Sequence, residues 1–172
     1  MGLDPKDRLV AAFTVAPDSD LVFVSSAGQL LRCAADAVPV QGAGARGVAG
    51  MKLKNGAVVV AAAASDEAGL VVTVAGTGVG ASSVKVTPLG RFPRTGRDGV
   101  GVRCHRLLAA ETAVLHAWAG SQPLACTPAG KALPLPDVDD RRDASGTPAP
   151  GAKMLIGGAA APAAVEPGVL FD

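Results

Sequence analysis

Residues 41–48 read QGAGARGV, and this pattern returns 54 residues later as TGRDGVGV at residues 95–102. A proline stands upstream of each stretch, at Pro39 and Pro93, and a third unit with Pro136 follows after a further shift of about 50 residues. Self-similarity at a fixed spacing indicates a repeat architecture. The glycines that align are Gly42 with Gly96 and Gly146, and Gly47 with Gly101 and Gly151.

A second likeness supports the repeat. The segment Val24–Gly28 is echoed by Cys126–Gly130, and Arg8–Ala12 resembles Ala57–Ala61, so the chain is expected to begin at the end of a preceding unit. A period of about 50 residues with about four short strands is typical of the blades of a propeller or related radial array. The alternative is a chance likeness among glycine-rich β loops.

The chain between these anchors is expected to form short strands and tight turns. Asn55-Gly56 and Ala27-Gly28 are turn signals beside apolar runs, and no stretch carries a capped helical period. The predicted class is therefore all-β. The expected strands cover residues 21–24, 30–33, 58–62, 70–75, 84–86, 100–104, 114–118 and 124–127.

Composition excludes several classes of protein. Of the 172 residues, 49% are hydrophobic and 18% charged, the reverse of the composition of disordered chains. The three cysteines are widely spaced without a Cys-x-x-Cys pair, which argues against a disulfide framework or a zinc site. No apolar run approaches the roughly 20 residues of a membrane span, so we expect a cytoplasmic protein with no membrane partner. Because the sequence has no Tyr, it offers no tyrosine nucleophile.

The motif at residues 39–53 resembles the blade signature of the C-terminal domain of the type IIA topoisomerase A subunits, the family of gyrase A and topoisomerase IV A. The gyrase hallmark is a heptad of Gln, two Arg-like residues, Gly, Gly, Lys and Gly. Gln41, Gly44 and Gly47 match it, and Arg46 stands for the lysine, but the two basic positions are lost and Ala45 replaces a glycine. Later runs, at residues 92–104, 116–120 and 140–148, are similar to the actinobacterial topoisomerase IV-like branch.

The resemblance implies a β-pinwheel, a propeller-like disc whose blades exchange strands and whose basic rim holds bent duplex DNA for strand passage. It implies about three units, fewer than full-length relatives carry: a connection at 1–18, blades at 19–65 and 66–120, a partial blade at 121–158 and an Ala/Pro-rich tail at 159–172. The implied partners are double-stranded DNA, the ATPase B subunit, and the remainder of the A subunit itself. The implied location is with the nucleoid. ATP and Mg would serve the whole enzyme, and no cofactor or metal is expected in this chain.

Charge placement agrees with a nucleic-acid partner although the net charge is only +1. Between Lys85 and Arg106 six cations accompany the single acid Asp98, and a second basic set lies in a stretch without acids between residues 36 and 66. Cations at glycine-rich loops suit phosphate oxygens, and the 3% aromatic content argues against base stacking. The candidate phosphate contacts are Arg46, Lys52, Lys54, Arg91, Arg94, Arg97, Arg103 and Arg106, with Gln41, Gly42, Gly44, Gly47, Gly96 and Gly101 shaping the loops. Ordinary solvated surface charges are the alternative.

The sequence evidence for other kinds of functional site is weaker. Residues 76–80 (GTGVG) imitate a dinucleotide-binding loop, but the following β-branched run ending at Pro88 does not have the pattern of the helix which that fold requires. His105 and His116 have no carboxylate or cysteine at metal-like spacing, so each is expected to be a satisfied or an exposed histidine. Residues 137–142 are expected to form a salt-bridged surface loop. No catalytic residue is assigned. Two functions remain, a duplex-DNA-binding module and a propeller-like protein-interaction module that binds no nucleic acid.

Overall fold

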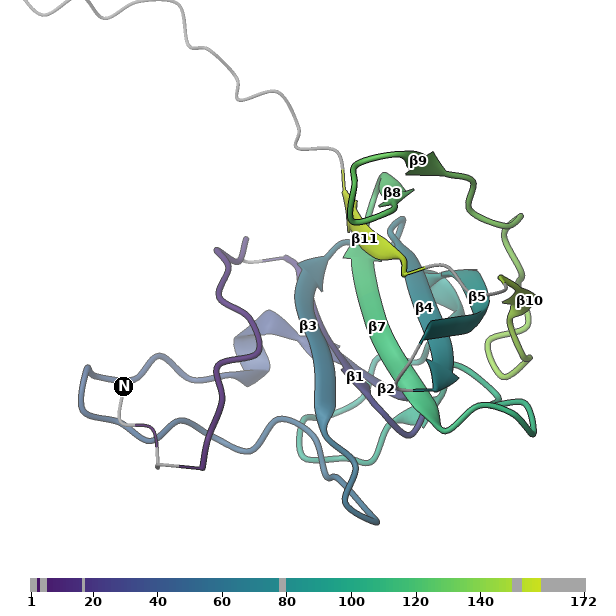
Figure 1. Cartoon of the computed structure of the whole chain (residues 1–172). Coiled ribbons are helices and arrows are strands. Elements are labelled where there is room, and N and C mark those ends of the chain that lie inside the picture. The colour runs from purple at the N-terminus through teal and green to yellow at the C-terminus, as the bar shows by residue number, and fades with distance from the viewer. Residues whose placement is uncertain (1–2, 4–5, 17, 78–79, 150–152, 159–172) are drawn as a thin grey trace, which may run out of the picture.

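The strands form three antiparallel sheets in a computed structural model that describes residues 3, 6–16, 18–77, 80–149 and 153–158 (Figure 1). The all-β prediction is confirmed. The first sheet, in the order β3-β1-β2-β6, contains β1 (Asp20–Ser25), β2 (Gln29–Ala34), β3 (Val59–Ser65) and β6 (Val102–Arg103). The second, in the order β10-β5-β4-β7, contains β4 (Leu70–Thr77), β5 (Gly80–Pro88), β7 (Ala113–Gly120) and β10 (Thr147–Pro148). The third, in the order β11-β8-β9, contains β8 (Pro123–Cys126), β9 (Ala132–Leu133) and β11 (Leu155–Gly158).

Strands cross between units of the sequence. The chain leaves the second hairpin and returns to the first sheet, where β6 pairs with β2 with Gln29 opposite Arg103. It leaves the third hairpin and returns to the second sheet, where β10 pairs with β5 with Thr147 opposite Val84. In each case the fourth strand of a sheet therefore comes from the sequence that follows the next hairpin.

Two apolar layers hold the sheets together, because alternate residues of a strand point to opposite faces. Between the first and second sheets lie buried side chains such as Val22, Val24 and Val71. Between the second and third sheets lie Val72, Val74 and others. Adjacent residues of β4 thus serve different layers, and β7 runs beside β3 where the first two sheets meet (Figure 1).

Local geometry repeats with the period found in the sequence. The 3-10 helices η1 (Ala35–Ala37) and η2 (Leu89–Arg91) follow β2 and β5 and lie 54 residues apart. The two turn glycines that end the echoed segments, Gly28 and Gly130, share a left-handed backbone with φ of 72° and 80°. The predicted repeat of the hairpin turn is therefore confirmed at the level of backbone conformation.

Some details differ from expectation. Asn55 and Gly56 form a turn with positive φ, but β3 pairs with β1, so the turn leads into β3 and does not join paired strands. The expected strand at 100–104 shortens to β6, and Arg8–Ala12 contains no strand. Gly151 and the tail lie outside the described residues. Within the described part of the chain, no helix is long and apolar enough to cross a membrane.

Candidate nucleic-acid interface

The segment from η2 to Arg106 carries five of the eight candidate phosphate contacts, and the protein anchors it firmly. Phe92 is only 1% exposed, and the backbone of Arg94 bridges to that of Arg32 on β2. The Thr95 N–H donates to the Arg32 carbonyl at 2.8 Å. The backbone after η2 therefore runs along the first sheet, and its cations project from a fixed support.

Gly101 allows this segment to approach β2 closely. Its φ is +78°, and an added Cβ would collide with the carbonyl of Leu30. Gly47, its equivalent in the first stretch, has a φ of +84° but no neighbour within 4 Å of an added Cβ. Gly42, Gly44 and Gly96 also have open space at that position, and Gln41 is exposed.

The two glycine-rich stretches lie side by side. The Lys52 N–H donates to the Gly99 carbonyl at 2.8 Å, and the Asp98 N–H donates to the Gly50 carbonyl at 2.6 Å. Arg97 then reaches back across this contact, donating from Nη1 to the Ala49 carbonyl at 3.1 Å. The fold thus brings candidate residues of two different units next to each other.

Five of the eight candidate cations have an ion pair or a charge-assisted bond to the protein. Lys52 lies 3.6 Å from Asp98, and Arg91 lies 2.9 Å from Asp140. Arg94 donates to the buried carboxylate of Asp20, and Arg97 donates to two backbone carbonyls. The hydrogen bond to Asp140 raises the pKa of Arg91 further, so this guanidinium is charged at every accessible pH. A fifth, Arg106, donates to the Asp143 carbonyl at 3.4 Å.

Three of the exposed candidates have side chains that form no hydrogen bond or ion pair with the described residues of the protein. They are Arg46, Lys54 and Arg103. Two of these three residues, Lys54 and Arg103, lie at or beside one surface hollow. Lys52 and Lys54 line a surface hollow of about 420 Å³ together with Gln29, and Arg103 stands directly opposite Gln29 in the β2–β6 ladder. Lys52 and Lys54 thus line the hollow themselves, and Arg103 lies in the strand beside Gln29, another residue of its lining. We call these three residues the hollow cations.

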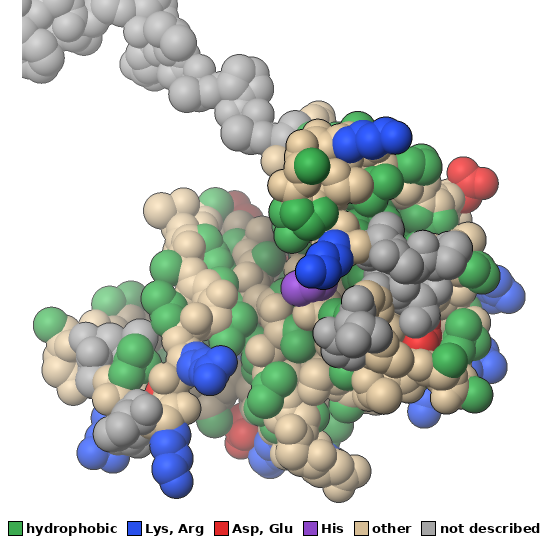
Figure 2. Space-filling view, in the orientation of Figure 1, with side chains coloured by type: hydrophobic (Ala, Val, Ile, Leu, Met, Phe, Trp, Pro, Cys, Tyr) green, Lys and Arg blue, Asp and Glu red, His purple; other side chains and the backbone are tan. Residues whose placement is uncertain are grey.

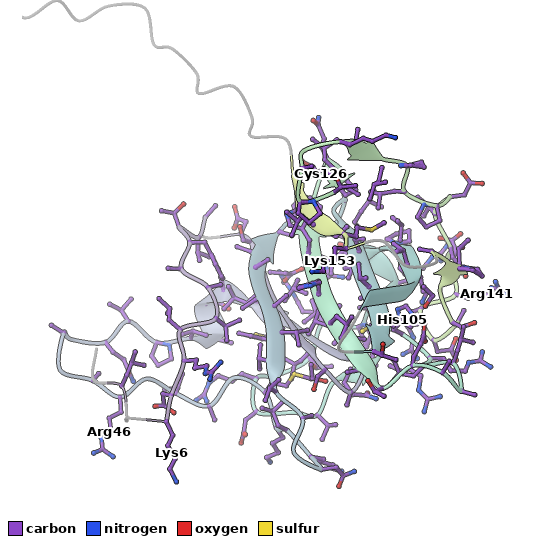
Figure 3. All side chains as sticks on the ribbon, in the orientation of Figure 1. Lys6, Arg46, His105, Cys126, Arg141 and Lys153 are labelled. Atoms are coloured by element: carbon purple, nitrogen blue, oxygen red, sulfur yellow. The ribbon has the colours of Figure 1, made fainter. Side chains whose placement is uncertain are left out.

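Arg46 lies elsewhere. Figure 3 places it at one end of the molecule near Lys6, with Arg141 on the opposite side. On the face drawn in Figure 2, Lys and Arg side chains occupy several separate places and do not form one continuous patch.

Lys85 corrects the charge count made from the sequence. It is 2% exposed and donates from Nζ to the carbonyls of Cys104 and Arg142 at 3.0 and 2.6 Å. Burial lowers its pKa, while nearby Asp139 and Asp143 oppose that shift. Lys85 therefore faces the interior, where it joins two loops, and contributes nothing to an outer basic surface.

His105 is also an interior residue, with both ring nitrogens satisfied as expected for a histidine without a catalytic or metal partner. Its Nδ1 lies 2.8 Å from Thr73 Oγ1, and its Nε2 accepts the Gly146 N–H at 3.2 Å. Burial lowers its pKa to about 4, so the ring is neutral at pH 7. Arg32 and Asp20 form a buried ion pair that supports the interface segment, and no local sequence pattern marks either residue as special.

Two competing sites are settled by the fold. Residues 76–80 include the end of β4 and the start of β5, and a strand follows them where a dinucleotide-binding fold needs a helix. The loop at 137–142 contains the ion pairs Arg141–Asp139 and Arg91–Asp140, as predicted for a surface loop. No group of residues suited to holding a metal ion occurs in the described ranges, and all three cysteines are free thiols.

Comparisons of sequence agree with this architecture. The family described as "DNA gyrase C-terminal domain, beta-propeller" matches residues 19–66 and 82–107. The chain is 36% identical over 100 residues to the DNA gyrase A protein of Pseudomonas aeruginosa, covering 58% of this chain and 10% of that protein. It is 34% identical over 107 residues to the DNA gyrase A protein of Deinococcus deserti, covering 59% and 13%. The aligned part is thus a small portion of those proteins.

Comparisons of structure give the same result. The crystal structure of the C-terminal domain of DNA topoisomerase IV superposes with a TM-score of 0.66 and 19% identity, covering 83% of this chain and 48% of that one. The DNA gyrase A C-terminal domain gives a TM-score of 0.58 and 18% identity, covering 77% and 43%. The chain spans about half of these solved domains. Sequence and fold together identify it as a C-terminal β-propeller domain of the DNA gyrase A and topoisomerase IV type.

Proposed function

We propose that this domain binds and bends duplex DNA and presents a DNA segment for strand passage, as one part of the A subunit of a type IIA topoisomerase. The observation that carries the proposal is that Lys52 and Lys54 line one hollow and that Arg103 stands opposite Gln29, another residue of its lining. Cations of this kind bind phosphate oxygens without reading bases, which suits a protein with 3% aromatic residues. Strand cleavage, ATP hydrolysis and Mg belong in this proposal to the remaining parts of the enzyme.

The contacts of each cation decide which substitutions test the proposal. Replacing Arg94 or Arg97 would also remove bonds that support the fold. Lys54 and Arg103 are better targets, because their side chains have no partner among the described residues. The test variant is Lys54→Gln with Arg103→Gln, and the matched control is Lys131→Gln with Lys153→Gln, which removes the same charge from two other exposed side chains.

The experiment is a gel-shift titration with a duplex of about 100 bp at several salt concentrations. For the unaltered chain we expect a log–log salt slope of roughly −4 to −6, since each neutralised phosphate contributes about −0.9. The test variant should bind more weakly, with a slope shallower by about two units. The control should keep the steeper slope. Binding that ignores salt between about 50 and 200 mM would exclude the electrostatic account.

The second candidate, a protein-interaction module, predicts no retardation of duplex DNA at any salt concentration. Equal retardation by the test variant and the unaltered chain would instead show that the hollow cations are not the contact surface. The two results are distinguishable, because the first removes binding altogether and the second leaves it intact.

A further inference from the structure

The 54-residue repeat places two equivalent turns before two strands. The Ala57 N–H donates to the Lys54 carbonyl at 3.0 Å just before β3, and the Glu111 N–H donates to the Leu108 carbonyl at 2.9 Å just before β7. Lys54 and Leu108 are 54 positions apart, as are the first residues of β3 and β7. Leu108 therefore takes in the second turn the place that Lys54 takes in the first.

The second turn is adjacent to the hollow that Lys54 lines. Thr112 and Ala113 follow this turn directly in the chain, and both line the hollow together with Lys54. The two turns therefore lie at the same end of β3 and β7, which run side by side (Figure 1). The turn that contains Leu108 thus borders the surface at which we propose that DNA binds.

The tip of the second turn is apolar, and the exposed charges beside it in the chain are positive. Leu108 is 42% exposed, and the two alanines that follow it are exposed as well. Arg103 and Arg106 precede the turn and are exposed, whereas Glu111, the one acid between residues 103 and 112, is only 7% exposed. Proteins that bend DNA through its minor groove combine cations with an apolar wedge of this kind.

A buried polar network holds the turn in one conformation. The Leu108 N–H donates to Glu111 Oε2 at 2.7 Å, and the other carboxyl oxygen of Glu111 accepts a hydrogen bond from the Ser83 hydroxyl. Ser83 Oγ also lies 3.1 Å from His105 Nε2. Only the backbone of Leu108 takes part in these bonds, so its side chain is left at the surface.

Both ends of the turn are fixed to other parts of the fold. The Arg106 N–H donates to the Ala144 carbonyl at 3.0 Å, and the Thr112 N–H donates to the Gly76 carbonyl, at the end of β4, at 2.9 Å. A tip that is already held in place loses little conformational freedom when it enters a groove. The fold therefore presents Leu108 on a rigid support.

We propose that Leu108 is a wedge that enters the minor groove of the bound duplex and partly unstacks one base step, so that the DNA bends there. This inference rests on the proposed function, because it requires that DNA lies over Lys54 and over the equivalent position 108. Apolar wedges kink a duplex by roughly 20–90°. Pyrimidine–purine steps such as TA unstack most easily, so the wedge should prefer them.

Permanganate oxidation of thymines, which is faster when a thymine is unstacked, tests the wedge on a duplex with several TA steps. The unaltered chain should raise the reactivity of thymines in these steps. Leu108→Ser should lower the reactivity to that of free duplex and keep the salt slope of the gel shift, because the side chain makes no phosphate contact. The control Leu124→Ser changes a 58% exposed leucine on β8 and should keep the reactivity. Full reactivity with Leu108→Ser would overturn the proposal.

A second variant tests whether position 108 faces DNA. Leu108→Lys introduces the residue found at the equivalent place of the first turn, so it should add a phosphate contact. The salt slope should become steeper by about one unit while the thymine reactivity is lost. An unchanged slope would overturn the proposal.

The two proposals fail in different ways. Retardation of the duplex by the unaltered chain without any rise in thymine reactivity would overturn the wedge and leave the proposed function standing. Absence of retardation would exclude the proposed function and the wedge together.

Discussion

Asp20 and Arg32 form a buried ion pair at the centre of the contact between two units, with Oδ2 2.6 Å from Nη2 and side chains 3% and 6% exposed. Arg32 also donates to the carbonyl of Phe92 at 3.1 Å, and Arg94 bonds the other oxygen of Asp20. The carboxylate of Asp20 thus joins the first hairpin to the interface segment. Arg94, a candidate DNA contact, therefore also contributes to the fold.

We expect Asp20→Ala to lower the free energy of unfolding by about 3–5 kcal/mol, because it leaves the buried Arg32 with only the exposed carboxylate of Glu67, 3.8 Å away. Urea unfolding followed by circular dichroism measures the change. Asp140→Ala is the control, since it breaks an exposed pair with Arg91 and should leave the urea midpoint within experimental scatter. An unchanged midpoint for Asp20→Ala would contradict the role of this pair.

Gly101→Ala should destabilise the fold by roughly 1–3 kcal/mol, because the position has positive φ and the added methyl meets the Leu30 carbonyl. Gly96→Ala is the matched control in the same segment, with no neighbour within 4 Å of the added carbon. Thermal unfolding of the two variants should therefore differ clearly. Equal melting temperatures would show that β6 does not approach β2 as described.

The stability of the domain should fall as the pH drops from about 6.5 towards 4. Burial lowers the pKa of His105 to about 4, so in that range the unfolded chain binds a proton that the folded chain does not. The difference from the ordinary value of 6.5 corresponds to about 3 kcal/mol for this residue. Urea unfolding at a series of pH values measures the slope.

Substituting each histidine in turn shows which residue causes the dependence of unfolding free energy on pH. His105→Gln removes the titrating ring and should flatten the dependence of unfolding free energy on pH between about 4 and 6.5. His116→Gln changes an exposed histidine and should retain the slope of the unaltered chain. If His105→Gln keeps the full slope, the acid sensitivity of the domain belongs to groups other than His105.

Arg103→Gln and Arg94→Gln should separate DNA binding from stability. Arg103 is exposed with no side-chain partner among the described residues, so its loss should make the salt slope shallower by about one unit and leave the urea midpoint unchanged. Arg94→Gln should weaken DNA binding and also lower the midpoint, because Arg94 bonds Asp20. A lower midpoint for Arg103→Gln would mean that this side chain has a structural role.

The sequence by itself determined the structural features that are specified by residues close together in the chain. The turn at Gly28 and its echo at Gly130 follow from glycine positions, and the two glycine-rich stretches recur at a spacing of 54 residues. The structure then showed that η1 and η2 recur at the same spacing. Such patterns are visible because a turn or a strand face is specified within a few residues. The all-β class and the resemblance to the topoisomerase domain rest on these local signals.

Only the tertiary structure decided which strand completes each sheet and which cations face water. The first sheet takes its fourth strand, β6, from residues more than 60 positions after β2. No local sequence pattern encodes this pairing. Lys85 and Arg32 look in sequence like any other surface cation, yet both are buried because distant carbonyls and a carboxylate replace their water. Lys54 and Arg103 also come close to one hollow only through tertiary structure. Lys54 lines the hollow, and the pairing of β6 with β2 places Arg103 opposite Gln29, which lines it too.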